Sequence, residues 1–155
     1  MPHIKSPLAL ILTIHLFILS ACGGGSSSSG VDPTVAGENI PAIFVGVYKG
    51  TLNLTADAVG ITESDTFEIT ITVFEDGTIR FDGDEPDETF TAGITNDGDF
   101  AGNITIQEDE CSGTVGVTGR VDGTTATGTI EGDGECDISG LTVDVDLSGD
   151  FSATK

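Results

Sequence analysis

The chain has 155 residues, of which 26 are acidic and five are basic, so its formal net charge at pH 7 is −21. A surface this negative repels phosphate backbones, because nucleic-acid binding depends on Lys and Arg side chains that displace condensed counterions. Nucleic acid is therefore excluded as a partner. The negative charge either keeps a β protein soluble or serves to bind cations.

The first segment predicts a cleaved targeting signal. Lys5 and the free amino terminus are positive, and Pro7 to Leu19 form an apolar run shorter than the roughly 20 residues that span a bilayer. The run ends in Leu19-Ser20-Ala21-Cys22, which resembles the lipobox of bacterial lipoproteins. This resemblance implies cleavage before Cys22, acylation of that cysteine with chains such as palmitate, and anchoring at a membrane surface. A retained transmembrane anchor is the alternative.

The residues after Cys22 predict a tether. In enteric-type lipoproteins an aspartate at the next position retains the protein in the inner membrane, and Gly23 stands there instead. The resemblance thus implies the outer membrane, on its periplasmic or its surface face. Residues 23–30 are all Gly and Ser, a composition that behaves as a flexible coil. We expect a signal peptide over 1–21, the lipidated cysteine and tether over 22–41, and a folded domain over 42–155.

The two histidines argue against catalysis, because His3 and His15 both lie in the segment expected to be removed. The remaining domain then lacks the usual general base, the Ser/His/Asp and Cys/His nucleophile systems, and histidine-ligated zinc. Paired carboxylates could serve glycoside hydrolysis, but no pair stands out. We expect no enzymatic activity.

From Ala42 onward the dominant pattern has period two, which is typical of strands with one wet and one dry face. No window has helical periodicity. The expected strands cover residues 48–54, 67–73, 79–81, 90–94, 100–106, 115–121, 126–130 and 141–151, and two hairpins turn at Glu75-Asp76-Gly77 and Asp122-Gly123.

These segments predict an all-β fold of about eight strands joined by short turns. Such an antiparallel meander tends to close on itself, because closure removes exposed edges. We predict a small up-and-down β-barrel, with a two-sheet sandwich as the alternative. Glycines at strand positions suit the bends of a tight barrel, namely Gly46, Gly50, Gly102, Gly116, Gly119 and Gly128.

Cys111 and Cys136 remain as a pair once Cys22 carries lipid. In an oxidising compartment we expect them to form a disulfide. Their surroundings, 105–113 and 129–136, are similar, and this imperfect repeat predicts that the two cysteines lie at equivalent ends of neighbouring hairpins. A reactive thiol pair is the alternative, although neither a CxxC spacing nor a nearby base lowers a thiol pKa.

Three acidic turns, 82–88, 96–99 and 131–135, could present oxygen ligands to a hard cation. None matches the EF-hand loop, and turns favour Asp and Gly for conformational reasons. We expect no cofactor, with calcium held by Asp82, Asp84 and Asp87 as the alternative.

Tyr48 and the phenylalanines either form the core or line a ligand mouth, as in lipocalins. The lipidated cysteine, the tether, the glycine-rich β domain and the closing residues 149–155 (Gly-Asp-Phe-Ser-Ala-Thr-Lys) resemble the barrel lobes of surface lipoproteins of the transferrin-binding-protein type. The resemblance implies a displayed binding module. Those proteins also carry a partner-binding handle domain that has no counterpart here, so transferrin binding is not implied. We expect an envelope-structural or partner-binding lipoprotein, with a carrier of a small apolar ligand as the alternative.

Overall fold

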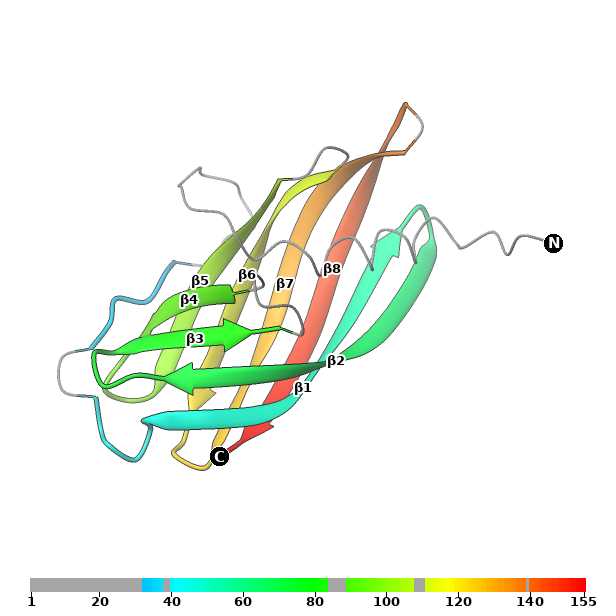
Figure 1. Ribbon diagram of the computed structural model, residues 1–155. Helices are drawn as coiled ribbons and strands as arrows, with labels where there is room; N and C mark the ends of the chain where they lie inside the picture. The colour runs from blue at the N-terminus through cyan, green and yellow to red at the C-terminus, as the bar shows by residue number, and fades with distance from the viewer. Residues whose placement is uncertain (1–31, 38–39, 84–88, 108–110, 139) are drawn as a thin grey trace.

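The structure is a computed structural model that describes residues 32–37, 40–83, 89–107, 111–138 and 140–155. Eight antiparallel strands are hydrogen-bonded in chain order, and β1 pairs with β8, so the sheet closes into a barrel (Figure 1). The predicted up-and-down barrel is confirmed. The expected signal peptide and most of the tether lie outside the described residues. The strands are β1 Gly46–Ala58, β2 Ile61–Val73, β3 Thr78–Asp82, β4 Thr89–Ile94, β5 Asp99–Gln107, β6 Cys111–Val121, β7 Thr125–Ile138 and β8 Leu141–Thr154.

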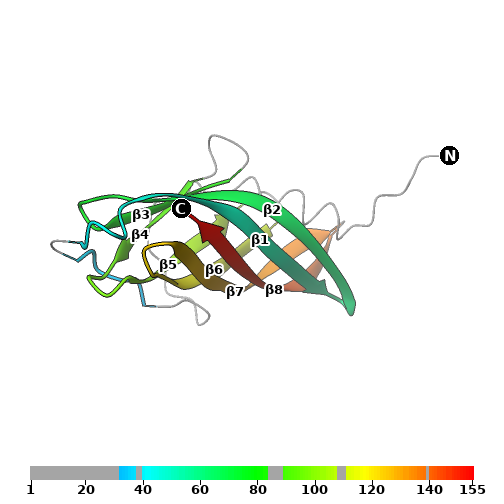
Figure 2. The ribbon, with the colours of Figure 1, turned by 90° about the horizontal axis from the view of Figure 1, so that it is seen from below.

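The two ends of the barrel differ because the strands have unequal lengths. β1 and β2 have 13 residues each and β7 and β8 have 14, whereas β3 has five and β4 has six. We call the end where β1 begins and β8 finishes the capped end, and the end with the β1–β2 and β7–β8 turns the hairpin end. The short strands β3 and β4 lie toward the capped end, and the two long hairpins extend beyond them (Figures 1 and 2).

The period-two pattern places one apolar row of each strand inside the barrel. On β8, for example, Val143, Val145 and Leu147 are buried while the residues between them are exposed. The core divides along the barrel into two clusters of buried side chains. The cluster at the capped end includes Tyr48, Ile71, Phe81, Phe90, Phe100, Val117 and Phe151, and the cluster at the hairpin end includes Leu54, Ala56, Cys111, Val115, Cys136, Val143, Val145 and Leu147.

Phenylalanine rings lying on glycines shape the capped half. Phe100 pairs across the sheet with Gly119, and Phe151 with Gly128, and a Cβ atom at either glycine would overlap the ring. A Cβ at Gly102 would meet the ring of Phe90 in the same way. Glycine weakens an isolated strand, but a ring stacked on it restores buried contact area and lets the strand coil closely.

Residues before β1 close the capped end. The Thr34 N–H donates to the Ala101 carbonyl (2.9 Å) and the Gly37 N–H to the Ile94 carbonyl (2.8 Å), so this segment runs along β5 and β4. Ile40 is buried in the capped-end cluster and Phe44 packs against it. The folded unit therefore includes residues that precede Ala42, where the sequence pattern placed its start.

Truncation of Phe151 tests the ring-on-glycine packing. Phe151 is 2 % exposed, contacts Phe81 with ring centroids 5.4 Å apart, and covers Gly128, so we expect Phe151→Ala to lower the free energy of unfolding by about 3–5 kcal/mol. Phe74→Ala is the matched control, since that ring is 36 % exposed and should cost less than about 1 kcal/mol. Urea denaturation measures both, and equal losses in the two variants would contradict the packing argument.

Candidate functional site

The capped end offers no ligand mouth at Tyr48. This side chain is fully buried, and its hydroxyl donates to the Phe44 carbonyl at 2.7 Å. Lys155 covers the same end, because its Nζ donates to the carbonyls of Ile43 (3.1 Å) and Val45 (2.5 Å) and lies 5.6 Å from the Tyr48 ring centroid. The tyrosine thus belongs to a sealed plug.

Aromatic rings fill the interior just beyond this plug. Phe81 lies at the centre of the group, with ring centroids 5.6 Å from Phe90, 5.6 Å from Phe100 and 5.4 Å from Phe151. These distances are typical of favourable aromatic packing. Of the two sequence alternatives for the aromatic residues, the core role holds for this group.

The pKa of Tyr48 is raised above 10.0, first because burial disfavours the phenolate and second because the Asp122 carboxylate repels it. The pKa of Asp122 is itself lowered, because its carboxylate accepts hydrogen bonds from the backbone N–H groups of Thr125 and Thr124. This Asx-type turn shapes the β6–β7 connection.

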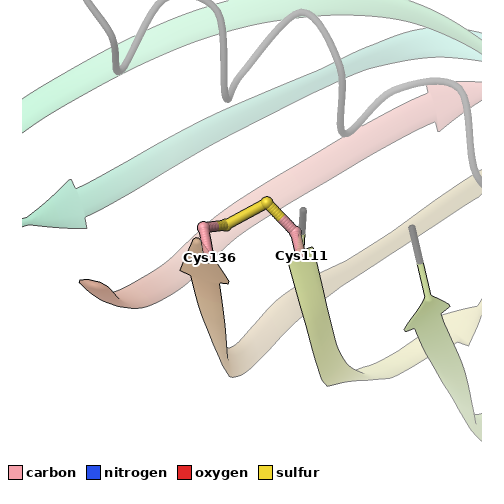
Figure 3. The surroundings of a disulfide bond; sticks show 2 residues. All are labelled: Cys111 and Cys136. Carbon is pink, nitrogen blue, oxygen red and sulfur yellow. A yellow bond between two sulfur atoms is a disulfide. The ribbon is translucent and has the colours of Figure 1, made fainter. Parts of the chain in front are cut away.

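Cys111 and Cys136 form a disulfide at the hairpin end (Figure 3). They lie directly opposite each other, Cys111 at the start of β6 and Cys136 near the end of β7. The prediction that they occupy neighbouring hairpins is wrong: they join the two strands of one hairpin, because the repeat spacing matches the length of that hairpin. In the chain-entropy model, a crosslink with a sequence separation of 25 stabilises by about 3 kcal/mol.

The prediction of an acidic turn at 131–135 is wrong, because these residues lie within β7 and pair with β6 and β8. The described residues provide no ligand set for the calcium alternative. The Asp82 carboxylate is 3.0 Å from the Arg80 Nε, so it already forms an ion pair with the Arg80 guanidinium. Asp84 and Asp87 lie outside the described residues. Within the described ranges, no group of three or more His, Cys, Asp or Glu side chains is arranged to hold a metal ion.

An acidic surface covers the outside of β7, β8 and β1 toward the hairpin end. Asp146 on β8 lies directly opposite Asp133 on β7 and also directly opposite Asp57 on β1. Like charges in register destabilise a sheet. The alternation in sequence predicts that such residues face water, but only the strand register reveals that they form a continuous row.

All basic residues beyond Cys22 lie toward the capped end. Arg120 binds Asp99 at 2.8 Å and Arg80 binds Asp82, while Lys155 lies on the plug and Lys49 pairs in register with Thr154. The surface at the hairpin end is consequently negative throughout the described strands, and its field attracts cations.

Among the described strands, β2 has an unpaired sheet edge at the hairpin end. β3 pairs with β2 only from Thr70 to Val73, so no described strand flanks Ile61–Ile69 on the side away from β1. The inward-facing row of this part of β2 consists of the partly exposed Glu63, the exposed Asp65 and the partly exposed Phe67. Sequence reasoning missed this edge because the period-two pattern does not reveal how far β3 extends.

No protein-family model matches the chain, and a search of curated proteins gives no match. Within the described ranges, no helix has the length and hydrophobicity needed to cross a membrane.

The raised pKa of Tyr48 predicts alkaline sensitivity. Because the folded state holds the phenol proton more tightly than the unfolded state, this contribution to stability is complete below pH 10 and is lost as the pH rises through the folded pKa. The chain has one tyrosine and no tryptophan, so ultraviolet absorbance of tyrosinate reports Tyr48 alone. We expect the absorbance titration of the folded protein to have its midpoint at a higher pH than the titration of the protein unfolded in urea.

Asp122→Asn is the control for the cause of this shift. This substitution removes the Asp122 charge, which is the smaller of the two causes of the raised Tyr48 pKa, and keeps an oxygen that can accept the hydrogen bonds of the turn. The Tyr48 titration midpoint should therefore fall but stay above the value measured in urea. Identical midpoints for folded and unfolded wild-type protein would refute the buried environment of Tyr48.

Proposed function

We propose that this protein is a lipid-anchored, non-enzymatic component of the bacterial envelope whose barrel binds a protein partner. The anchor rests on the lipobox-like Leu19-Ser20-Ala21-Cys22 and the Gly/Ser run that follows it. About ten residues connect Cys22 with the first described residue, Asp32, and they span at most roughly 35 Å when extended. The barrel is thereby held near the membrane surface, and Gly23 favours the outer membrane.

The filled interior of the capped half is the observation that favours partner binding over ligand transport. Four phenylalanine rings occupy that space, and the Tyr48 plug closes the end. A carrier needs an apolar cavity of a few hundred cubic ångströms. The outer surface and the free edge of β2 remain as the surfaces for recognition.

Catalysis is left out of the proposal because the chain has no histidine after His15. In the described part of the structure, the shifted pKa values belong to Tyr48, which lies in the plug, and to Asp122, which lies in a turn.

A carrier of a small apolar ligand is the second candidate. It is favoured by the partly exposed Phe67, Ile104 and Ile130, which pack on the cluster at the hairpin end. Native mass spectrometry of protein isolated from the envelope separates the candidates. We expect the mass of the acylated chain with two protons fewer than its reduced form, whereas a further mass that is lost on unfolding would establish the carrier.

Replacement of Cys22 tests the anchor. We expect wild-type protein in the membrane fraction, and Cys22→Ser protein in the precursor form without acyl chains, because the thiol that receives the lipid is missing. Ser26→Ala in the tether is the control and should behave as wild type. Mass spectrometry of the N-terminal peptide reports acylation, and an unmodified Cys22 in mature wild-type protein would refute this part of the proposal.

A further inference from the structure

We propose that Ile61–Phe67 on the edge of β2 is the docking site for an extended, basic segment of a protein partner, which adds to the barrel as a further strand. The inference rests on the proposed function, since it names the class of partner for the same module. Three features of this edge support it: the direction of its backbone N–H groups, the pattern of its inward-facing side chains and its negative charge.

The backbone of this edge is directed toward the open side. The Phe74 N–H donates to the Thr78 carbonyl across the β2–β3 turn, and alternate residues of a strand direct their N–H groups to the same side. Thr62, Ser64 and Thr66 share that direction along an uninterrupted register with β1. The Thr66 N–H donates to the Asp65 carboxylate at 2.7 Å, which agrees with a direction away from β1. An added strand would find a row of donors and acceptors here.

The side chains along the edge define the pattern of the guest strand. Phe67, Asp65 and Glu63 occupy successive inward positions, because they pair in register with the inward Leu52, Leu54 and Ala56. An antiparallel guest would therefore place an apolar side chain beside Phe67 and a Lys or Arg beside each carboxylate. Opposite charges in adjacent strands stabilise pairing, and like charges oppose it.

Charge excludes a second copy of the chain as the occupant. Two β2 edges in contact would bring the Glu63 and Asp65 carboxylates of both copies together, in a chain whose net charge is −21. Inward-pointing charges on edge strands are a known protection against self-pairing. Asp65 adds to this protection because it covers the Thr66 N–H. A basic guest removes both the charge repulsion and the blocked N–H. Its ammonium group can form an ion pair with the Asp65 carboxylate, which frees the Thr66 N–H to bond to the guest strand.

A designed peptide tests the proposal on the full-length protein in detergent. The probe is acetyl-Lys-Val-Thr-Lys-Thr-Lys-Thr-amide, which places valine beside Phe67 and lysines beside Asp65 and Glu63. A peptide with glutamate in place of each lysine is the charge control. We expect calorimetric binding of the lysine peptide that weakens with salt, and no binding of the glutamate peptide.

Two substitutions separate the backbone from the charge contribution. Thr66→Pro removes the outward N–H and should weaken binding by at least about tenfold, while Thr66→Val also loses the hydroxyl but keeps the N–H and should bind like wild type. Glu63→Gln with Asp65→Asn should weaken binding by about threefold to tenfold. Glu131→Gln with Asp133→Asn makes the same change in charge on the outer face of β7 and should leave binding unchanged.

Hydrogen exchange of the wild-type protein covers the case in which Thr66→Pro fails to fold. Bound peptide should slow exchange at Ser64 and Thr66. Protection confined to β7 and β8 would show that the acidic outer face binds the peptide, and equal weakening by both pairs of charge substitutions would show that binding follows net charge alone. Either result would overturn the proposal.

Photo-cross-linking in cells distinguishes failure of this inference from failure of the proposed function. A photoreactive residue is placed at Ser64 on the edge or at Asp146 on the acidic face. An adduct at Ser64 that contains a basic, alternating segment of the partner supports the edge. Adducts confined to Asp146 overturn the edge but keep partner binding, and no adduct at either position overturns both.

Discussion

Closure of this barrel depends on aromatic rings that lie on glycines of the neighbouring strand. Phe100 packs directly on the backbone of Gly119 and Phe151 on that of Gly128, because neither glycine has a Cβ atom, and Phe81 packs against both rings. The domain has no tryptophan, so these few rings supply much of the buried apolar area at the capped end. The same rings pack against one another inside the capped half of the barrel.

Electrostatics divides the molecule along the barrel axis. The positive side chains Arg80, Arg120 and Lys155 are held at the capped end by carboxylates or carbonyl oxygens. The charged side chains on the described strands of the opposite end are all acidic. The disulfide joins β6 and β7 at that acidic end, where Asp133 and Asp146 repel each other across the sheet. A covalent link is useful there because charge repulsion and small interior side chains limit what packing can contribute.

The short strands β3 and β4 leave strand edges unpaired at the hairpin end among the described strands, and the edge of β2 has features that suit recognition. The short strands leave part of β2 flanked by β1 alone among the described strands, and that part carries carboxylates on its inner row. A lipid anchor would hold the barrel close to other envelope proteins, so even a modest affinity for a basic strand becomes effective at a high local concentration.

The amino-acid sequence by itself determined the number and order of the strands, the wet and dry faces of their central parts, the two tight hairpins and the pairing of Cys111 with Cys136. These features follow from short-range patterns and from the number of cysteines. Period-two alternation marks the strands, Asp-Gly marks the turns, and Cys111 and Cys136 are the two cysteines that follow Cys22. Tertiary structure decided the rest, because register and strand extent depend on contacts between distant residues. It placed both cysteines on one hairpin, sealed Tyr48 beneath Lys155, and aligned Asp57, Asp146 and Asp133 in one row. It also left part of β2 without a second neighbour among the described strands.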